Sequence, residues 1–147
     1  MDTSRSAALL EALAWLCVMR VAMACWPFRR IASRLGLTRA CTDDAASAAT
    51  LSAARQVAWA VQAVARRTPW PSKCLVQALA GMAMLRRRQL PGTLYFGVRK
   101  QAGPHTGLDA HAWVCCGNAA LIGQPRDNEF VVVGVFRGPT HVGLPVP

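Results

Sequence analysis

The first half of the chain carries its hydrophobic residues at helical spacing. The stretch up to about Leu37 is rich in Ala and Leu, and Ser6 is placed to cap a helix there. Pro27 predicts a break after Trp26, because a proline inside a helix removes a backbone hydrogen bond, and Gly36 predicts the stop. We therefore expect an interrupted helical segment at the start of the chain.

Two further helices are predicted between residues 41 and 88. A cap at residues 41–44 leads into a helix that runs to about Arg67, and its apolar positions recur at three- and four-residue spacing: Leu51, Ala54, Val57, Ala58, Val61 and Val64. Pro69 and Pro71 end that pattern, since neither can donate a backbone hydrogen bond. Ser72 is placed to cap a third helix, residues 73–88, with a buried stripe of Leu75, Leu79, Met82 and Leu85.

The pattern changes after Gly92 from helical spacing to alternation, with Leu94, Phe96 and Val98 on one face of a strand. Further strands are predicted over residues 109–116, 119–122 and 130–136, with residues 117–118 as a hairpin turn. Helices followed by strands predict an α+β fold, in which an antiparallel sheet packs on a central helix. The 147 residues suit a single domain with a helical part (1–67), a core (68–136) and a coil tail (137–147).

Two residues of this framework have the placement of a nucleophile and its base. Cys74 falls in the first turn of the third helix, where unpaired N–H groups and the helix dipole stabilise a thiolate. Ala78 and Gly81 follow on the same helix face, where small residues leave room for a strand or a substrate. His111 lies on an alternating strand and could take the thiol proton. Each residue alone has a plainer interpretation, because a free Cys or a strand His often simply packs in a core.

Charge and composition both point to partners. Lys and Arg number 17 against 7 Asp and Glu, a formal charge of +10, which favours nucleic acid, an anionic membrane surface or an acidic peptide, although Arg groups also stand at solvated helix ends. Hydrophobic residues make up 53% of the chain and charged ones only 16%, so we expect apolar surface that meets a partner. Trp15, Trp26 and Phe28 beside Arg29 and Arg30 are the expected interface, unless that segment packs as core.

The six cysteines suggest neither a disulfide framework nor a metal site. No CxxC pair and no His/Cys cluster with zinc-ligand spacing occurs, so we expect reduced thiols, no metal and no cofactor in a cytoplasmic protein. Residues 7–28 are apolar, but they contain Glu11 and Arg20 and lack a basic start and a cleavage site. We expect a buried or interfacial helix there, which allows a peripheral membrane contact, and no transmembrane span.

Five short stretches together resemble a known family: Pro71-Ser-Lys-Cys74-Leu75, Gln77-Ala-Leu79, Met84-Leu-Arg-Arg-Arg88, Leu94-Tyr-Phe-Gly97-Val98 and Ala110-His111-Ala-Trp-Val114. They are similar to the transglutaminase-like leader peptidases of lasso-peptide biosynthesis in their stand-alone form, and the resemblance covers nearly the whole chain. It implies a papain-like or transglutaminase-like core in an intracellular bacterial cysteine protease. Cys74 would be the nucleophile and His111 the base, and the substrate would be the leader of a ribosomally synthesised precursor.

The same resemblance implies partners. In the split form of these systems, a small leader-recognition protein of the winged-helix type presents the precursor leader peptide to the protease. A separate, ATP-using lasso cyclase then joins the freed amine to an Asp or Glu side chain. We expect the split form here, because the chain shows no leader-recognition domain of its own.

The sequence departs from the family at the third catalytic position. Relatives carry a polar residue about a dozen positions after the His, where it orients the imidazole. That place falls at Gly123 and Gln124 here. Asp127 is the first candidate for the third member and Gln124 is the second. Asp109 could share a face with His111, but we expect it to serve the neighbouring loop.

Two other functions stay open beside the peptidase. A non-catalytic basic module that binds nucleic acid or an acidic protein would account for the charge. The chain lacks aromatic residues interleaved with the basic ones and shows no nucleic-acid-binding motif, so we expect no nucleic acid. An acyl-transfer enzyme would form the same thioester and let an amine resolve it in place of water.

Overall fold

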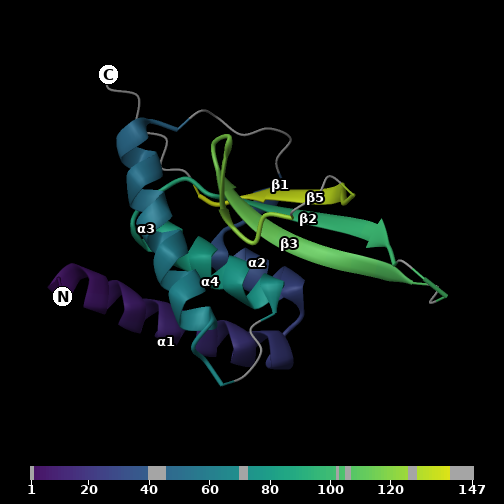
Figure 1. Cartoon of the computed structure of the whole chain (residues 1–147), viewed down its shortest axis with the longest axis horizontal. Helices are drawn as coiled ribbons and strands as arrows, with labels where there is room; N and C mark the ends of the chain where they lie inside the picture. Colours follow the sequence, from purple (N-terminus) through teal and green to yellow (C-terminus); the bar gives the residue numbers. More distant parts are fainter. Residues whose placement is uncertain are drawn as a thin grey trace.

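Figure 1 shows the computed structural model of the protein, in which helices form one layer and an antiparallel sheet forms the other. The structure describes residues 2–39, 46–69, 73–101, 103–104, 107–125 and 129–139. Within these residues the elements are α1 (Thr3–Cys25), α2 (Phe28–Leu35), β1 (Thr38–Arg39), α3 (Ala48–Ala65), α4 (Cys74–Arg87), β2 (Thr93–Lys100), β3 (Leu108–Cys116), β4 (Ala119–Ile122) and β5 (Val131–Arg137). The predicted α+β class is confirmed. Most of the predicted coil tail lies outside the described residues.

The break between the first two helices falls where Pro27 predicts it. Helix α1 ends two residues before this proline, which is the N-cap of α2. Gly36 closes α2 in the left-handed conformation, with φ at 69°, which a glycine adopts without strain. The cap predicted at Ser6 is wrong, because α1 already begins at Thr3 and Ser6 lies inside it.

The second helix starts later than predicted. Ser47 caps α3 by accepting a hydrogen bond from the Thr50 N–H at 3.2 Å, and residues 41–44, the predicted cap, lie outside the described residues. The apolar stripe of α3 is confirmed in its middle, since four of its members are buried: Ala54, Val57, Ala58 and Val61. This stripe faces the rest of the helical layer, in which α3 contacts both α1 and α4.

Helix α4 is the central helix, as the sequence predicts. It contacts α1 and α3 on one side and β2, β3 and β4 on the other, so residues 78–85 are buried all round and the predicted single stripe is too narrow. Gly81 faces β4, where a Cβ on this glycine would collide with the side chain of Ile122. The small residue therefore lets the helix lie close against the sheet.

The strands pair antiparallel in the order β1-β5-β2-β3-β4. Gly117, with φ at 59°, stands in the predicted hairpin turn between β3 and β4. Strand β1 is not predicted by the sequence. It is two residues long and pairs with β5, with Thr38 opposite Arg137 and Arg39 opposite Phe136.

The two faces of the sheet have different neighbours. Leu94, Ala112 and Val114 are buried in the core shared with the helices. Residues of the opposite parity form an aromatic row, in which the rings of Tyr95 and Trp113 stack at 5.7 Å between centroids. His111 continues this row, with its ring 6.1 Å from that of Trp113. Alternation along β3 therefore gives His111 and Ala112 opposite faces, as predicted.

Two of the three aromatic residues expected at an interface pack into the core. The ring of Phe28 meets those of Phe96 and Phe136 edge-on at 5.1 and 5.5 Å, and Trp15 packs against the buried cluster. Phe28 and Trp15 thus follow the alternative left open by the sequence, in which this segment packs against the core. Trp26 remains 48% exposed, so an interface at this residue stays a prediction.

Candidate active site

Cys74 is the first residue of α4. Lys73 is the N-cap and makes no capping hydrogen bond with its side chain, while Ser72, the predicted cap, lies outside the described residues. The Cys74 side chain is half-buried against the core and its thiol is free. At this position the side chain lies at the positive end of the helix dipole.

His111 is held by a backbone carbonyl. Its Nε2 lies 2.5 Å from the carbonyl oxygen of Gly123, in the segment that follows β4. Because a carbonyl oxygen only accepts, Nε2 of His111 must carry a proton, which leaves Nδ1 of the neutral ring as the free base. The ring of Phe130 lies 5.4 Å from the imidazole and that of Trp113 stacks on it at 6.1 Å. These neighbours fix both the tautomer and the orientation of the imidazole.

Gly123 can present its carbonyl because it has no side chain. Its φ is +71°, in the left-handed region, and a Cβ would lie 3.1 Å from the carbonyl oxygen of Ala112 and 3.8 Å from Nε2 of His111. The sequence did not reveal this contact, since a backbone carbonyl has no residue signature. Its one signal is the glycine twelve positions after His111, where the family resemblance implies a polar residue.

A polar cleft of about 410 Å³ joins the Gly123 segment to the first turns of α4. It is lined by Gln62, Ala65 and Arg66 at the end of α3, by Gln77 of α4, and by Gly123 and Gln124. Gln77 stands one helical turn after Cys74, and Gly123 accepts the bond from His111, so residues next to both candidate groups line the cleft, while Cys74 and His111 themselves do not. The side-chain amide of Gln62 donates to the Leu121 carbonyl at 2.8 Å, which fixes α3 against the end of β4.

The candidate pair is not directly bonded in this structure. Within the described residues, no hydrogen bond joins the thiol of Cys74 to the ring of His111. Catalytic hydrogen bonds are often long in proteins without substrate and tighten only in the substrate complex.

The residues considered for the third position have separate outcomes. Asp127 lies outside the described residues. Gln124 is exposed at the edge of the polar cleft, and in the described part of the chain it makes no hydrogen bond to His111. Asp109 pairs with Arg99 at 3.2 Å, on the strand facing its own, so its partner is a cation of the sheet and not the imidazole.

Metal-binding clusters are also absent from the part of the chain that the structure describes. No three His, Cys, Asp or Glu side chains gather there in a way that could hold an ion. No disulfide joins the cysteines of the described residues, which are Cys17, Cys25, Cys74, Cys115 and Cys116.

Comparison with known families places these residues in a wider group. The profile of the transglutaminase-like superfamily matches residues 14–135, well over half of the chain. The chain belongs to the transglutaminase-like superfamily. This superfamily generally comprises cysteine proteases and transglutaminases, so it supports thiol-based chemistry of the peptidase type. No curated protein and no solved structure matches the chain significantly.

For a transglutaminase-like chain, the matched range has a clear structural meaning. It begins within α1 and ends within β5, and it includes Cys74, His111 and the carbonyl of Gly123. The central helix and the antiparallel sheet, which the sequence predicted, are thus the elements of the superfamily domain.

Proposed function

We propose that this chain is a cysteine peptidase that removes the leader from a ribosomally synthesised lasso-peptide precursor. The observation that carries the proposal is the bond from Nε2 of His111 to the Gly123 carbonyl, because it leaves Nδ1 of the imidazole as the base. The superfamily match supports thiol chemistry, and the short motifs around Cys74 and His111 support the leader-peptidase class.

The proposed reaction uses the two groups in turn. Nδ1 of His111 takes the proton of the Cys74 thiol, and the thiolate attacks the carbonyl carbon of the scissile peptide bond. As the C–N bond breaks, the imidazolium returns its proton to the leaving amine and a thioester to Cys74 remains. A water molecule, deprotonated by the same nitrogen, then hydrolyses the thioester and restores the thiol.

Gly123 would assist each step through its carbonyl. When the imidazole is charged, the Nε2–H bond to this oxygen becomes a charge-assisted one, which is roughly twice as strong as a neutral bond. The carbonyl thus serves the purpose of the third residue found in relatives. Asp127 remains our first side-chain candidate for that position and Gln124 the second. Because the carbonyl already orients the imidazole, loss of either side chain should reduce the rate less than loss of a sole orienting residue would.

The proposed partners follow from the same class of system. The precursor leader would enter the polar cleft, delivered by a leader-recognition protein, and the lasso cyclase would take the freed core. Exposed Arg66 and Gln124 offer the cleft hydrogen-bonding groups for an extended peptide backbone.

Incubation of the purified chain with a leader–core precursor, with and without the leader-recognition protein, tests the proposal by mass spectrometry. We expect cleavage at one peptide bond by wild type and a loss of at least about 10³-fold in Cys74→Ala. Cys17→Ser and Cys25→Ser are the matched controls, because both residues are free thiols on α1, whereas Cys74 is on α4. Each control should cleave at the wild-type rate. A Cys74→Ala protein that cleaves like wild type, or a wild type that leaves every precursor intact with its partner present, overturns the proposal.

A further inference from the structure

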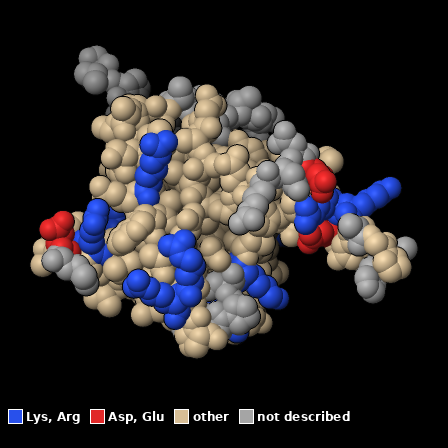
Figure 2. Space-filling model, in the orientation of Figure 1, with Lys and Arg blue, Asp and Glu red and all other residues tan. Residues whose placement is uncertain are grey.

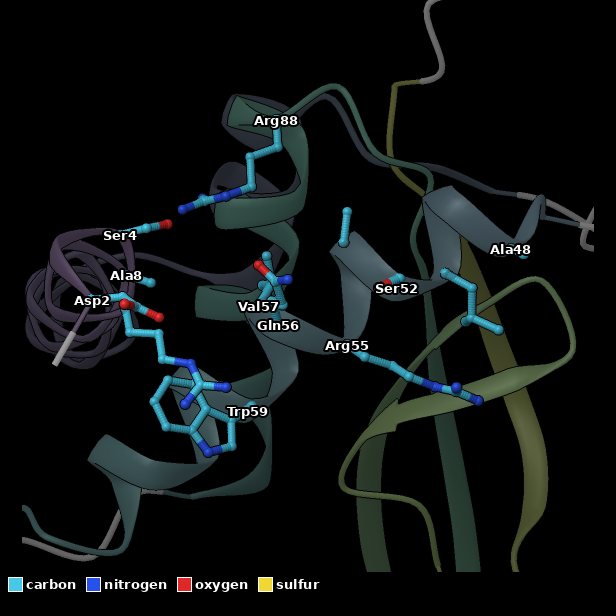
Figure 3. A pocket seen from close by; sticks show the side chains of 13 residues that line it. Asp2, Ser4, Ala8, Ala48, Ser52, Arg55, Gln56, Val57, Trp59 and Arg88 are labelled. Carbon is cyan, nitrogen blue, oxygen red and sulfur yellow. The ribbon is translucent and has the colours of Figure 1, made fainter.

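A second cavity, of about 720 Å³, opens on the helical layer between α1 and the first half of α3 (Figure 3). None of the residues that line the polar cleft line this one, so the two hollows are separate. Its volume is within the range of pockets that bind ligands or peptide side chains, roughly 300–1,000 Å³. Nothing in the proposed peptidase reaction uses it.

The cavity contains an aromatic platform with a cation on it. Trp59 of α3 is 44% exposed, unlike most tryptophans of folded proteins, and the guanidinium of Arg5 from α1 lies 5.5 Å from the centre of its ring. An exposed Trp and an Arg together are the combination most enriched at binding hot spots.

Further cations surround the platform. Arg88, just after α4, points across the cavity towards Ser4 in Figure 3, and Glu11 holds its guanidinium at 2.7 and 3.1 Å. Arg55 extends from α3 on the other side. The lining has three Arg side chains and a single acid, Asp2, and because Glu11 compensates the charge of Arg88, the positive excess comes from Arg5 and Arg55. This excess of positive charge attracts a negatively charged ligand.

The remaining lining is apolar or small and gives the cavity a floor. Ala8 of α1 and Leu51 and Val57 of α3 provide apolar surface, and Ser52 and Gln56 add polar groups. A single aromatic residue over a hollow of this kind suits one apolar side chain with acidic neighbours. Single-stranded nucleic acid instead requires a basic groove with several stacking rings along its length.

We propose that this cavity binds an acidic peptide segment, with carboxylates paired to Arg5 and Arg55 and an apolar side chain on Trp59. Binding at this site does not involve the thiol of Cys74, so the test of the site is independent of the test of the peptidase proposal. Should both hold, it is a second contact for the leader, remote from the bond that is cut.

Fluorescence anisotropy of the full chain with a short labelled peptide of alternating Glu and Leu tests the site. We expect binding that weakens as salt is added, and no binding of the same peptide with Lys in place of Glu. Trp59→Ala and Arg5→Glu should each weaken binding roughly tenfold, the loss of about 1.4 kcal/mol expected for a hot-spot residue. Arg55→Glu, an exposed position on α3, provides a third variant should one of the others unfold.

Leu108→Ala and Lys100→Glu are the matched controls. Leu108 is 65% exposed and Lys100 is exposed at the end of β2, and neither residue lines the cavity. Both controls should bind the acidic peptide like wild type. Equal loss in controls and cavity variants, or no binding by wild type, overturns the site. Tighter binding of a labelled single-stranded oligonucleotide, with loss in the same cavity variants, would assign the cavity to nucleic acid and overturn the peptide.

Discussion

At the level of single residues, the tautomer of His111 decides which nitrogen can act as the base. The Gly123 carbonyl fixes this tautomer, and substitution of the glycine tests it. Ala at a φ of +71° is strained and its Cβ would press on the Ala112 carbonyl, so the Gly123 segment must move away from the ring. A hydrogen bond to a charged group contributes about 1.5–3 kcal/mol. We therefore expect Gly123→Ala to slow single-turnover cleavage by roughly ten- to hundredfold.

The control for this substitution is Gly103→Ala. Gly103 also has a positive φ, of +98°, but a Cβ there would meet nothing within 4 Å. Gly103→Ala should cleave like wild type. Nitrogen-15 spectra should show a proton on Nε2 of His111 in both wild type and Gly103→Ala. If Gly123→Ala keeps both the wild-type rate and this tautomer, the carbonyl does not position the imidazole.

Asp127 gives a second prediction at this scale. An orienting residue usually costs less than a nucleophile or base when it is lost, and here the carbonyl already holds Nε2. Asp127→Ala should therefore retain measurable cleavage, well above that of Cys74→Ala, in the same mass-spectrometric assay. Wild-type activity in Asp127→Ala combined with impaired activity in Gln124→Ala would move the role to Gln124.

The sequence predicted the placement of Cys74 and His111 within their elements, because helix starts and strand alternation have residue signatures. It could not predict the contact to Gly123. That contact depends on where the chain turns after β4, and the atom involved belongs to the backbone, which is chemically the same in every residue.

Among the elements, those with an extended hydrophobic pattern were predicted, whereas the shortest strand, β1, was not. Helix α3 and strands β2 and β3 followed their patterns, but β1 has only two residues and owes its existence to pairing with β5. The buried stripe of α4 was too narrow for a related reason. A helix with neighbours on every side is apolar all round, so its sequence does not show which side faces the sheet.

The contact between α4 and β4 gives a prediction about stability. Gly81→Ala gains helix propensity but drives its Cβ into the end of the Ile122 side chain, and overpacking of this kind costs about 1–3 kcal/mol. Ile122→Val removes the colliding methyl group and costs about 0.5–1.5 kcal/mol alone. Urea unfolding of both single variants and the double variant should show the double to be less destabilised than the sum. Strict additivity would mean that these two side chains do not meet.

A second prediction at this scale concerns the link between α1 and the end of α4. Glu11 accepts hydrogen bonds from Arg87 at 2.8 Å and from Arg88 at 2.7 and 3.1 Å. Partial burial raises the pKa of Glu11, but the hydrogen bonds and charges of Arg88 and Arg87 outweigh it and hold the pKa below its ordinary value. A depressed carboxylate pKa contributes stability above the pKa of the unfolded chain, and that stability is lost as the pH falls through the folded value.

Glu11→Gln should therefore lower the free energy of unfolding by about 1 kcal/mol at neutral pH. The difference from wild type should shrink as the pH falls below the ordinary pKa of a Glu, because the protonated carboxyl resembles the amide. Urea titrations at neutral and acidic pH measure this. Glu129→Gln is the control, since Glu129 is 68% exposed and lies 3.4 Å from Arg99, and it should change little. A Glu11→Gln deficit that persists unchanged in acid would contradict the charge-based account.

At the scale of the whole molecule, the surplus of apolar residues seen in the composition reappears on one helix. Large side chains of α1 face solvent: Leu10 is 69% exposed, Val18 52% and Val21 62%. By length and composition α1 could cross a membrane, with a mean hydropathy of 1.8 and 22% of that window buried, but soluble core helices and signal sequences pass the same test. Figure 2 shows basic groups well separated over a largely uncharged surface.

This exposed face of α1, continuing to Trp26 and the exposed Arg29 of α2, is where we expect the leader-recognition protein to dock. Exposed aromatic and Arg side chains beside apolar surface are typical of interface hot spots. Trp26→Ala and Arg29→Glu should each weaken binding of that protein by roughly tenfold, as measured by surface plasmon resonance. Because both side chains are exposed, circular dichroism should show folded variants.

Leu108→Ala and Lys100→Glu are the controls for this docking prediction. Leu108 is 65% exposed and pairs with Lys100 at the tip of the β2–β3 hairpin, which extends away from α1 in Figure 1. Both should bind the partner like wild type, because their changes in apolar area and charge fall outside the expected interface. Sedimentation with vesicles of anionic lipid tests the alternative, in which the α1 face binds a membrane surface. Capture of wild type by vesicles, lost in Trp26→Ala while partner binding is unchanged, would assign this face to a membrane surface and leave the leader-recognition protein to dock elsewhere.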